Sequence, residues 1–180
     1  MNYPLISEYI DAIINAEENL DRLSNLRPIM NVNGEPIMSS GNFAVVFKMT
    51  DGTKEYALKC FLKDQIERED AYRMIGKELK SGGLYEMVRV QYFDNELFVD
   101  TKRSTCNEFP VVCMDWVEGI TMDNWLILNA DKKEKLVKFY NRFHELCVDL
   151  LCSHVAHGDI KPDNILVEYI AKRIPLIALK

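Results

Sequence analysis

The chain has 180 residues, of which 48% are hydrophobic and 28% are charged, and its formal net charge is −6 at pH 7. This length and composition fit one globular domain, or slightly more than one, with enough apolar residues to bury a core. The acidic balance disfavours binding to nucleic acid or to an anionic membrane. No apolar run is long enough to cross a bilayer, so we expect no membrane partner.

The cysteines and the start of the chain favour a cytoplasmic protein. Acidic residues interrupt the first twenty positions, and no basic segment precedes an apolar one, so we expect no secretory signal. The cysteines are odd in number, form no C-x-x-C motif and mostly lie in apolar runs, which predicts reduced core thiols rather than disulfides or a zinc site. They are Cys60, Cys106, Cys113, Cys147 and Cys152.

Apolar spacing in the first half predicts one helix and then a sheet. Residues 7–23 have helical spacing with Ser7 as the N-cap, and residues 31–36 form a turn. Residues 42–50 and 54–62 read as a hairpin with a two-residue turn at Asp51-Gly52. A polar helix is predicted at 63–79. Three further strands are predicted at 85–94, 96–102 and 109–117.

The second half is predicted to be mostly helical. Residues 131–153 form the longest expected helix, and residues 164–170 and 174–180 form two short strands. The expected fold class is therefore α+β, with a small antiparallel-sheet half followed by a helical half in a two-lobed layout. The apolar side of the long helix is expected to include Leu136, Phe139, Tyr140, Phe143, Cys147 and Leu150.

The stretch His157 to Val167, "HGDIKPDNILV", concentrates ionisable chemistry before an apolar run. Asp159 can accept a proton or orient a hydroxyl, Lys161 can neutralise a phosphoryl group, and Asn164 can offer an amide oxygen to Mg²⁺. These parts suit phosphoryl transfer. The alternative is a loop whose polar residues only turn the chain after a helix.

This stretch resembles the catalytic loop of protein kinases, H-R-D-x-K-P-x-N. The resemblance implies that Asp159 is the catalytic base, that Lys161 steadies the γ-phosphate and that Asn164 binds Mg²⁺. Gly158 replaces the family's arginine, which puts switching by a phosphorylated activation loop in doubt. His157 is expected to be structural. The H-G-D order also occurs in small-molecule phosphotransferases that share the kinase fold.

Two upstream segments resemble the nucleotide-binding part of the same family. "YALKCF" matches the A-x-K motif with Ala57 and Lys59, whose lysine would hold the α- and β-phosphates of ATP. "SSGNFAVVF" aligns with the glycine-rich loop at Ser39, Gly41 and Val46, although only the middle glycine is present. Taken alone, each segment is better explained as an ordinary strand, and its position relative to the catalytic-loop stretch is what favours the resemblance.

The resemblance also implies a hinge and a glutamate partner. In "VVCMDWVEG", Met114 would be the gatekeeper, and the carbonyl of Asp115 and the N–H of Val117 would meet the adenine. The spacing alone fits a buried strand equally well. Glu67, Glu69 and Glu78 are candidates to pair with Lys59, and Glu69 is favoured.

The resemblance covers residues 37–180 and implies three regions: an N-terminal helical extension (1–36), a kinase N-lobe with the nucleotide-binding sheet and hinge (37–117) and the beginning of the helical C-lobe (118–180). No aspartate follows Asp163, so the family's second metal-binding aspartate is missing and the chain resembles a bacterial kinase-like protein cut before that motif. We therefore expect weak or no activity from this chain, and self-association through the apolar side of the helix at 131–153.

The expected function is ATP- and Mg²⁺-dependent phosphoryl transfer to serine or threonine hydroxyls of a protein substrate. One alternative is a pseudokinase or scaffold that binds nucleotide or a partner without catalysis. Another is a small-molecule phosphotransferase of the same fold.

Overall fold

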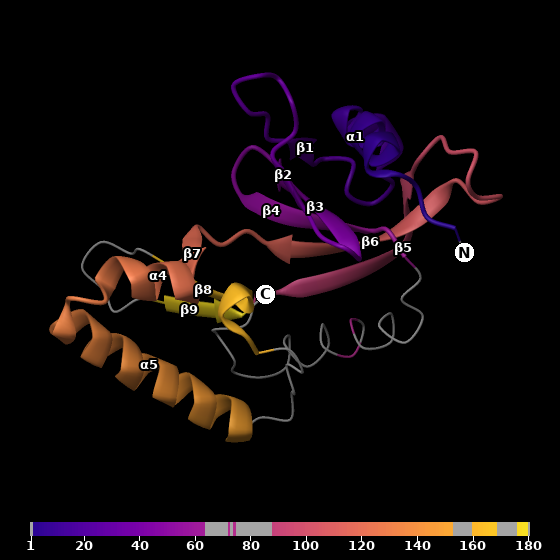
Figure 1. The fold of residues 1–180 in the computed structure, drawn as a ribbon. Helices are drawn as coiled ribbons and strands as arrows, with labels where there is room; N and C mark the ends of the chain where they lie inside the picture. The colour runs from indigo at the N-terminus through magenta and orange to yellow at the C-terminus, as the bar shows by residue number, and fades with distance from the viewer. Residues whose placement is uncertain are drawn as a thin grey trace. The chain divides into compact units, whose positions relative to one another are not determined.

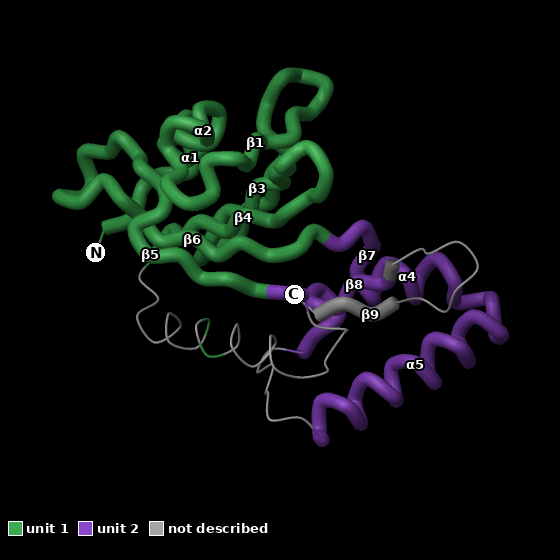
Figure 2. The backbone as a smooth tube through the Cα atoms, turned by 180° about the vertical axis from the view of Figure 1, so that it is seen from behind, with its two compact units in different colours: residues 1–76, 90–116 green, residues 77–89, 117–180 purple. Residues whose placement is uncertain are grey.

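The computed structural model describes residues 2–63, 72, 74, 88–152, 160–168 and 176–179. The chain divides into two compact units, one made of residues 1–76 and 90–116 and the other of residues 77–89 and 117–180 (Figure 2). The first unit contains a large sheet and the second contains most of the helix. The expected α+β class with an antiparallel sheet is confirmed.

The first unit is built on a six-stranded antiparallel sheet (Figure 1). Its strand order is β1-β3-β4-β6-β5, and β2 also pairs with β3. The predicted strands at 85–94 and 96–102 appear as one strand, β5, with an irregularity between Phe93 and Leu97. The bounds are β1 Arg27–Pro28, β2 Met38–Ser40, β3 Ala44–Thr50, β4 Glu55–Phe61, β5 Val90–Phe98 and β6 Glu108–Asp115.

Strand β3 shows why this segment is a strand. Burial alternates strictly along it, and Val45, Phe47 and Met49 are fully buried while the residues between them are half-buried. Because successive side chains of a strand point to opposite faces, this pattern places one face in the core. β-Branched and aromatic side chains suit that pleated surface.

Two helices near the N-terminus, α1 (Ile6–Ile14) and α2 (Ala16–Asn19), share the core with this sheet. Tyr9 and Ile13 are fully buried, and the Tyr9 hydroxyl donates a 2.7 Å hydrogen bond to the carbonyl of Phe61. Burial raises the pKa of that hydroxyl, so it stays a donor. The residues that the sequence analysis set apart as an extension are thus packed into the same hydrophobic cluster as the strands.

The start and end of the first helix differ from the prediction. Ser7 lies inside α1 and is not the N-cap; Leu5 holds that position, and its N–H donates to the Glu8 carboxylate at 2.7 Å. The predicted single helix at 7–23 is interrupted at Asn15, whose backbone leaves the helical region. A carboxylate in the first turn can satisfy a free N–H as well as a serine at the N-cap can.

The turn at 31–36 is confirmed, and the hairpin turn is shifted. Gly34 has φ +77°, and the Asn31 side chain accepts hydrogen bonds from the N–H groups of Asn33 and Glu35. The hairpin loop spans residues 51–54 and is centred one residue later than Asp51-Gly52, because Thr50 pairs with Glu55. Gly52 has φ +91°, a backbone conformation that glycine adopts more readily than other residues do.

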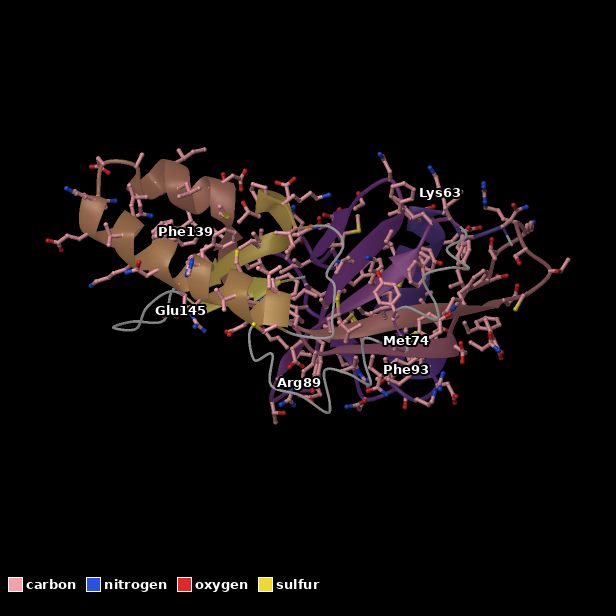
Figure 3. All side chains as sticks on the ribbon, turned by 90° about the horizontal axis from the view of Figure 1, so that it is seen from below. Lys63, Met74, Arg89, Phe93, Phe139 and Glu145 are labelled. Atoms are coloured by element: carbon pink, nitrogen blue, oxygen red, sulfur yellow. The ribbon has the colours of Figure 1, made fainter. Side chains whose placement is uncertain are left out.

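The second unit has its own small sheet and core. Strands β7 (Gly119–Thr121), β8 (Ile165–Glu168) and β9 (Leu176–Leu179) form an antiparallel sheet in that order. Helices α4 (Met122–Asn129) and α5 (Lys133–Cys152) accompany it, and η1 (Pro162–Asn164) is a single 3₁₀ turn. Trp125 of α4 stacks on Phe139 of α5 at 4.8 Å between ring centroids. Figure 3 shows Phe139 on α5.

The long helix is confirmed, but its buried side is partly different from the prediction. Leu146, which was not among the expected residues, is buried, whereas Tyr140 is 66% exposed. Tyr140 therefore belongs to the outer side of α5, with Val137, Val148 and Leu151, which are also exposed. In the described part of the chain, no helix is long and apolar enough to span a membrane.

The cysteine prediction holds only in part. All five thiols are free, but only Cys60 is fully buried, and Cys152 is exposed. Burial, together with the nearby Asp115 carboxylate, raises the pKa of Cys113 to about 12. Cys60 and Cys113 therefore remain neutral thiols that pack as small apolar groups.

A buried carboxylate ties the N-terminal segment to β5. Glu96 is 1% exposed; its Oε1 accepts a 2.7 Å hydrogen bond from the N–H of Leu23, and its Oε2 lies 2.9 Å from Nε of Arg22. Arg22 also donates to the Asp94 carbonyl and covers the ring of Phe93 at 5.0 Å. Glu96 lies within the irregularity of β5 between Phe93 and Leu97, directly after Asn95, which has a positive φ of 46°.

We predict that Glu96→Ala lowers the free energy of unfolding by about 2–4 kcal/mol, because it leaves a backbone N–H and a guanidinium without their acceptor. Glu96→Gln should cost less, since the amide oxygen still accepts one bond. Urea unfolding followed by circular dichroism measures both. Glu18→Gln, at an exposed glutamate of α2, is the control; an equal loss there would contradict the anchoring role.

Candidate functional site

Strand register gathers five of the predicted nucleotide-binding residues on one face of the large sheet. Ser39 lies opposite Val46, and Val46 lies opposite Lys59. Ala57, two residues before Lys59, lies opposite Met114. Directly paired residues and residues two apart on a strand share a face, so these five side chains occupy two neighbouring rows of the same surface.

Two half-buried lysines lie in these rows: Lys48, opposite Ala57 in one row, and Lys59 in the other. The neighbours of Lys59 across the strands are Val46 and Val112, which are apolar. The Nζ of Lys59 lies 3.0 Å from the Tyr72 hydroxyl and 5.6 Å from the centroid of that ring. A hydroxyl accepts one hydrogen bond but brings no negative charge, so among the described residues the Lys59 ammonium has no counter-ion.

The predicted glutamate partner cannot be placed, because Glu67, Glu69 and Glu78 lie outside the described residues. Tyr72, three positions after Glu69, was not anticipated. Its ring also lies 6.1 Å from that of Phe61. The only sequence signal for it was an aromatic residue within a polar helical pattern, which predicts packing rather than contact with a lysine.

The loop between β2 and β3 is exposed to solvent. Ser39 and Gly41 are exposed, and the Gly41 N–H donates a 2.9 Å hydrogen bond to the carbonyl of Ala44. A Cβ built on Gly41 would meet no atom within 4 Å, and its φ is not positive. Neither packing nor backbone strain within the described chain therefore requires glycine at this position. Close approach by another molecule is a remaining physical reason for it.

The predicted hinge begins where β6 ends. Asp115 is the last residue of β6 and pairs with Tyr56 of β4. The Trp116 N–H donates a 3.1 Å hydrogen bond to the carbonyl of Glu55. Within the described residues, no group accepts a hydrogen bond from the N–H of Val117.

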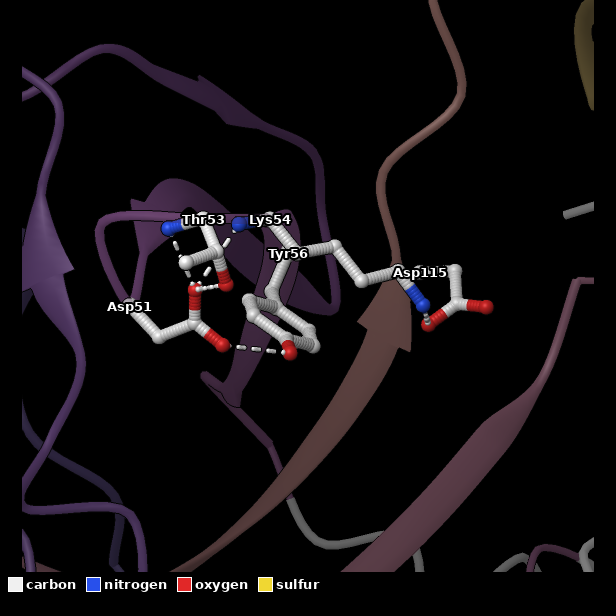
Figure 4. A network of polar contacts seen from close by, with 5 residues as sticks. All are labelled: Asp51, Thr53, Lys54, Tyr56 and Asp115. Atoms are coloured by element: carbon white, nitrogen blue, oxygen red, sulfur yellow. Dashed lines mark hydrogen bonds and ion pairs between the residues drawn. The ribbon is translucent and has the colours of Figure 1, made fainter.

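The tip of the β3–β4 hairpin carries a hydrogen-bond network that the sequence analysis missed (Figure 4). Oδ1 of Asp51 accepts bonds of 2.8 Å from the N–H and hydroxyl of Thr53 and from the N–H of Lys54. Oδ2 accepts a 2.8 Å bond from the Tyr56 hydroxyl. The Lys54 ammonium lies 2.7 Å from Oδ1 of Asp115. The D-G-T signal indicated the turn but gave no sign of this network.

These contacts shift two pKa values. The backbone and side-chain hydrogen bonds from Thr53 and Lys54 hold the pKa of Asp51 well below its usual range. The bond to that carboxylate raises the pKa of Tyr56. Asp51 is therefore ionised throughout the neutral range, and Tyr56 stays a donor.

The predicted catalytic stretch is described only from residue 160 onward. Asp159, Gly158 and His157 lie outside the described residues. Lys161 is exposed with an extended backbone, and η1 places Asn164 at the start of β8, with the Asn164 N–H bonded to the Lys161 carbonyl at 2.9 Å. Ile165 and Val167 are buried, so they fix this end of the loop in the core of the second unit.

The described residues contain no cluster of three or more histidine, cysteine or acidic side chains that could hold a metal ion. Asn164, which makes other contacts, supplies one neutral oxygen of the kind Mg²⁺ accepts. Neither the models of known protein families nor the curated protein sequences contain a match to this chain.

We predict that Asp51→Asn lowers the melting temperature at pH 7 and that this difference shrinks as the pH falls below about 4. The sign follows from the lowered pKa: ionised Asp51 stabilises the fold above the ordinary aspartate pKa of about 3.9, and this contribution is lost on protonation. Thermal melts from pH 7 to pH 3 measure it. Asp100→Asn, at an exposed aspartate of the same unit, is the control. A difference that stays constant with pH would contradict the prediction.

Proposed function

We propose that the chain is a protein-kinase-like module that binds ATP with Mg²⁺ and belongs to a protein that phosphorylates serine or threonine hydroxyls. The observation that carries the proposal is the shared sheet face of Ser39, Val46, Ala57, Lys59 and Met114. These residues were selected from sequence motifs alone, and the motifs contained no information about cross-strand register. A surface on which apolar side chains flank Lys59 suits a flat base next to an anionic chain.

In this proposal each part of the nucleotide meets a different group. The Lys59 ammonium, whose described partner is an uncharged hydroxyl, pairs with the α- and β-phosphates. The exposed backbone at Gly41 lets phosphate oxygens approach closely. The carbonyl of Asp115 and the N–H of Val117 receive the adenine edge, with Val46 and Ala57 against the ring.

The transfer chemistry belongs to the second unit. The acceptor hydroxyl oxygen forms a bond to the γ-phosphorus, the bond from that phosphorus to the β,γ-bridging oxygen breaks, and ADP leaves. Asp159 takes the hydroxyl proton, and Lys161 offsets charge on the γ-phosphoryl group. Asn164 would hold one Mg²⁺, which when bound neutralises negative charge on the phosphate oxygens.

Binding without transfer is the second candidate. Two sequence observations favour it: Gly41 is the single glycine of its loop, and Gly158 stands where the resembled family has an arginine. A scaffold of this kind would use the same sheet face but not Asp159.

A small-molecule phosphotransferase, suggested by the H-G-D order, differs in its acceptor rather than in its nucleotide site. We propose a cytoplasmic location, which the five free thiols fit.

We predict that ATP raises the melting temperature of the chain and that Lys59→Met removes most of this rise. A ligand that binds only the folded state stabilises it by about 2.7 kcal/mol at a concentration one hundred times its Kd. Differential scanning fluorimetry with ATP, with and without Mg²⁺, measures the shift.

Lys102→Met, at an exposed lysine of the same unit, is the matched control and should leave the shift unchanged. Asp159→Asn should keep ATP binding and abolish any transfer to a protein acceptor. If ATP causes no shift in a folded sample, or if Lys59→Met binds ATP as tightly as the wild type, the proposed nucleotide site is wrong.

A further inference from the structure

The tip of the β3–β4 hairpin holds the end of β6 at two points. The Lys54 ammonium pairs with the Asp115 carboxylate at 2.7 Å, and the Glu55 carbonyl accepts the Trp116 N–H at 3.1 Å. Lys54 and Glu55 are neighbours in the hairpin, and Asp115 and Trp116 are neighbours at the end of β6. Both links therefore join the same two short segments, about sixty positions apart along the chain.

A third contact reinforces the second link. The Lys48 ammonium lies 4.7 Å from the centroid of the Trp116 ring and 2.9 Å from Oε2 of Glu55. Glu55 thus binds the Trp116 backbone through its own carbonyl and binds Lys48 through its carboxylate. Lys48 is 13% exposed, and a cation over an indole ring is most strongly attracted when water is excluded.

The hairpin tip can position β6 because it is rigid. The Asp51 carboxylate accepts bonds from the Lys54 N–H and from the Tyr56 hydroxyl, on either side of Glu55. The Lys54 ammonium also lies 5.5 Å from the Tyr56 ring centroid, which limits the directions that its chain can take (Figure 4). A lysine held in this way loses less conformational entropy on pairing than a free one does.

We propose that Lys54 is a positioning residue that, through Asp115, fixes the backbone of residues 115–117 and thereby sets the affinity of the chain for the adenine base. This rests on the proposed function, in which the Asp115 carbonyl and the Val117 N–H meet adenine. The Asp115 carbonyl belongs to the last paired residue of β6, and the Val117 N–H lies two residues beyond it, where strand pairing no longer fixes the backbone. Preformed hydrogen-bonding groups bind more tightly than groups that must be ordered on binding.

The test compares three ligands on the full chain by isothermal titration calorimetry: ATP, adenosine and inorganic triphosphate. Lys54→Met and Asp115→Asn should each weaken ATP and adenosine about fivefold, which is about 1 kcal/mol, and should leave triphosphate unchanged. The double variant should be no weaker than either single variant, because both substitutions break one ion pair.

Glu17→Gln is the matched control, because it breaks the Arg27–Glu17 ion pair of similar exposure elsewhere in the same unit. It should change none of the three affinities. Amide hydrogen exchange at Trp116 and Val117 should be faster in both hairpin variants. A general loss of stability would instead weaken all three ligands together.

The outcomes separate this inference from the proposed function. If the wild type binds neither ATP nor adenosine, the proposed function falls and the positioning role falls with it. Two results would overturn only the positioning role of Lys54. In the first, the wild type binds ATP and both variants bind it as tightly as the wild type does. In the second, the variants lose as much affinity for triphosphate as for adenosine.

Discussion

The pairing of β4 with strands on both sides is the constraint on which the first unit depends. β4 lies between β3 and β6 in the sheet, so its register determines which side chains meet on each face. A slip of one residue would move Lys59 from the half-buried face into the face that contains Cys60 and Leu58, both fully buried. An ammonium group in that core would cost several kcal/mol, so the hydrophobic pattern itself opposes the slip.

The same constraint explains why the sheet tolerates a lysine at its centre. Position 59 faces the side where burial is incomplete, and its long methylene chain can cover apolar neighbours while Nζ reaches Tyr72. A strand whose remaining central positions are apolar would be more stable with an apolar residue in place of Lys59. The proposal that Lys59 binds phosphate gives this position a role other than folding.

The sequence predicted well the features that depend on local pattern. Runs of apolar, aromatic and β-branched residues located β3, β4 and β6, and helical spacing located α5, because each signal lies within one segment. The failures occur where distant segments decide the outcome. Nothing in the local sequence around Glu96 indicates that its carboxylate is buried. Its role is visible only when Arg22 and Leu23 lie against it. The link between Lys54 and Asp115 likewise requires β4 to pair with β6, which no local signal specifies. Tyr140 was placed on the wrong side of α5 because a helix with apolar residues on two sides has no unique inner face in its sequence.

The docking of the N-terminal helices has a consequence for how the protein is made. Arg22 and its partner Glu96 are 74 positions apart, and Tyr9 and its acceptor at Phe61 are 52 positions apart. At a synthesis rate of roughly 5–20 residues per second, the first helices emerge from the ribosome several seconds before β5 exists. During that time the side chains of Tyr9 and Ile13 have no sheet to pack against. Contacts over such separations slow folding, so the nascent chain passes through an interval in which its first apolar segment is open to chaperones or to other chains.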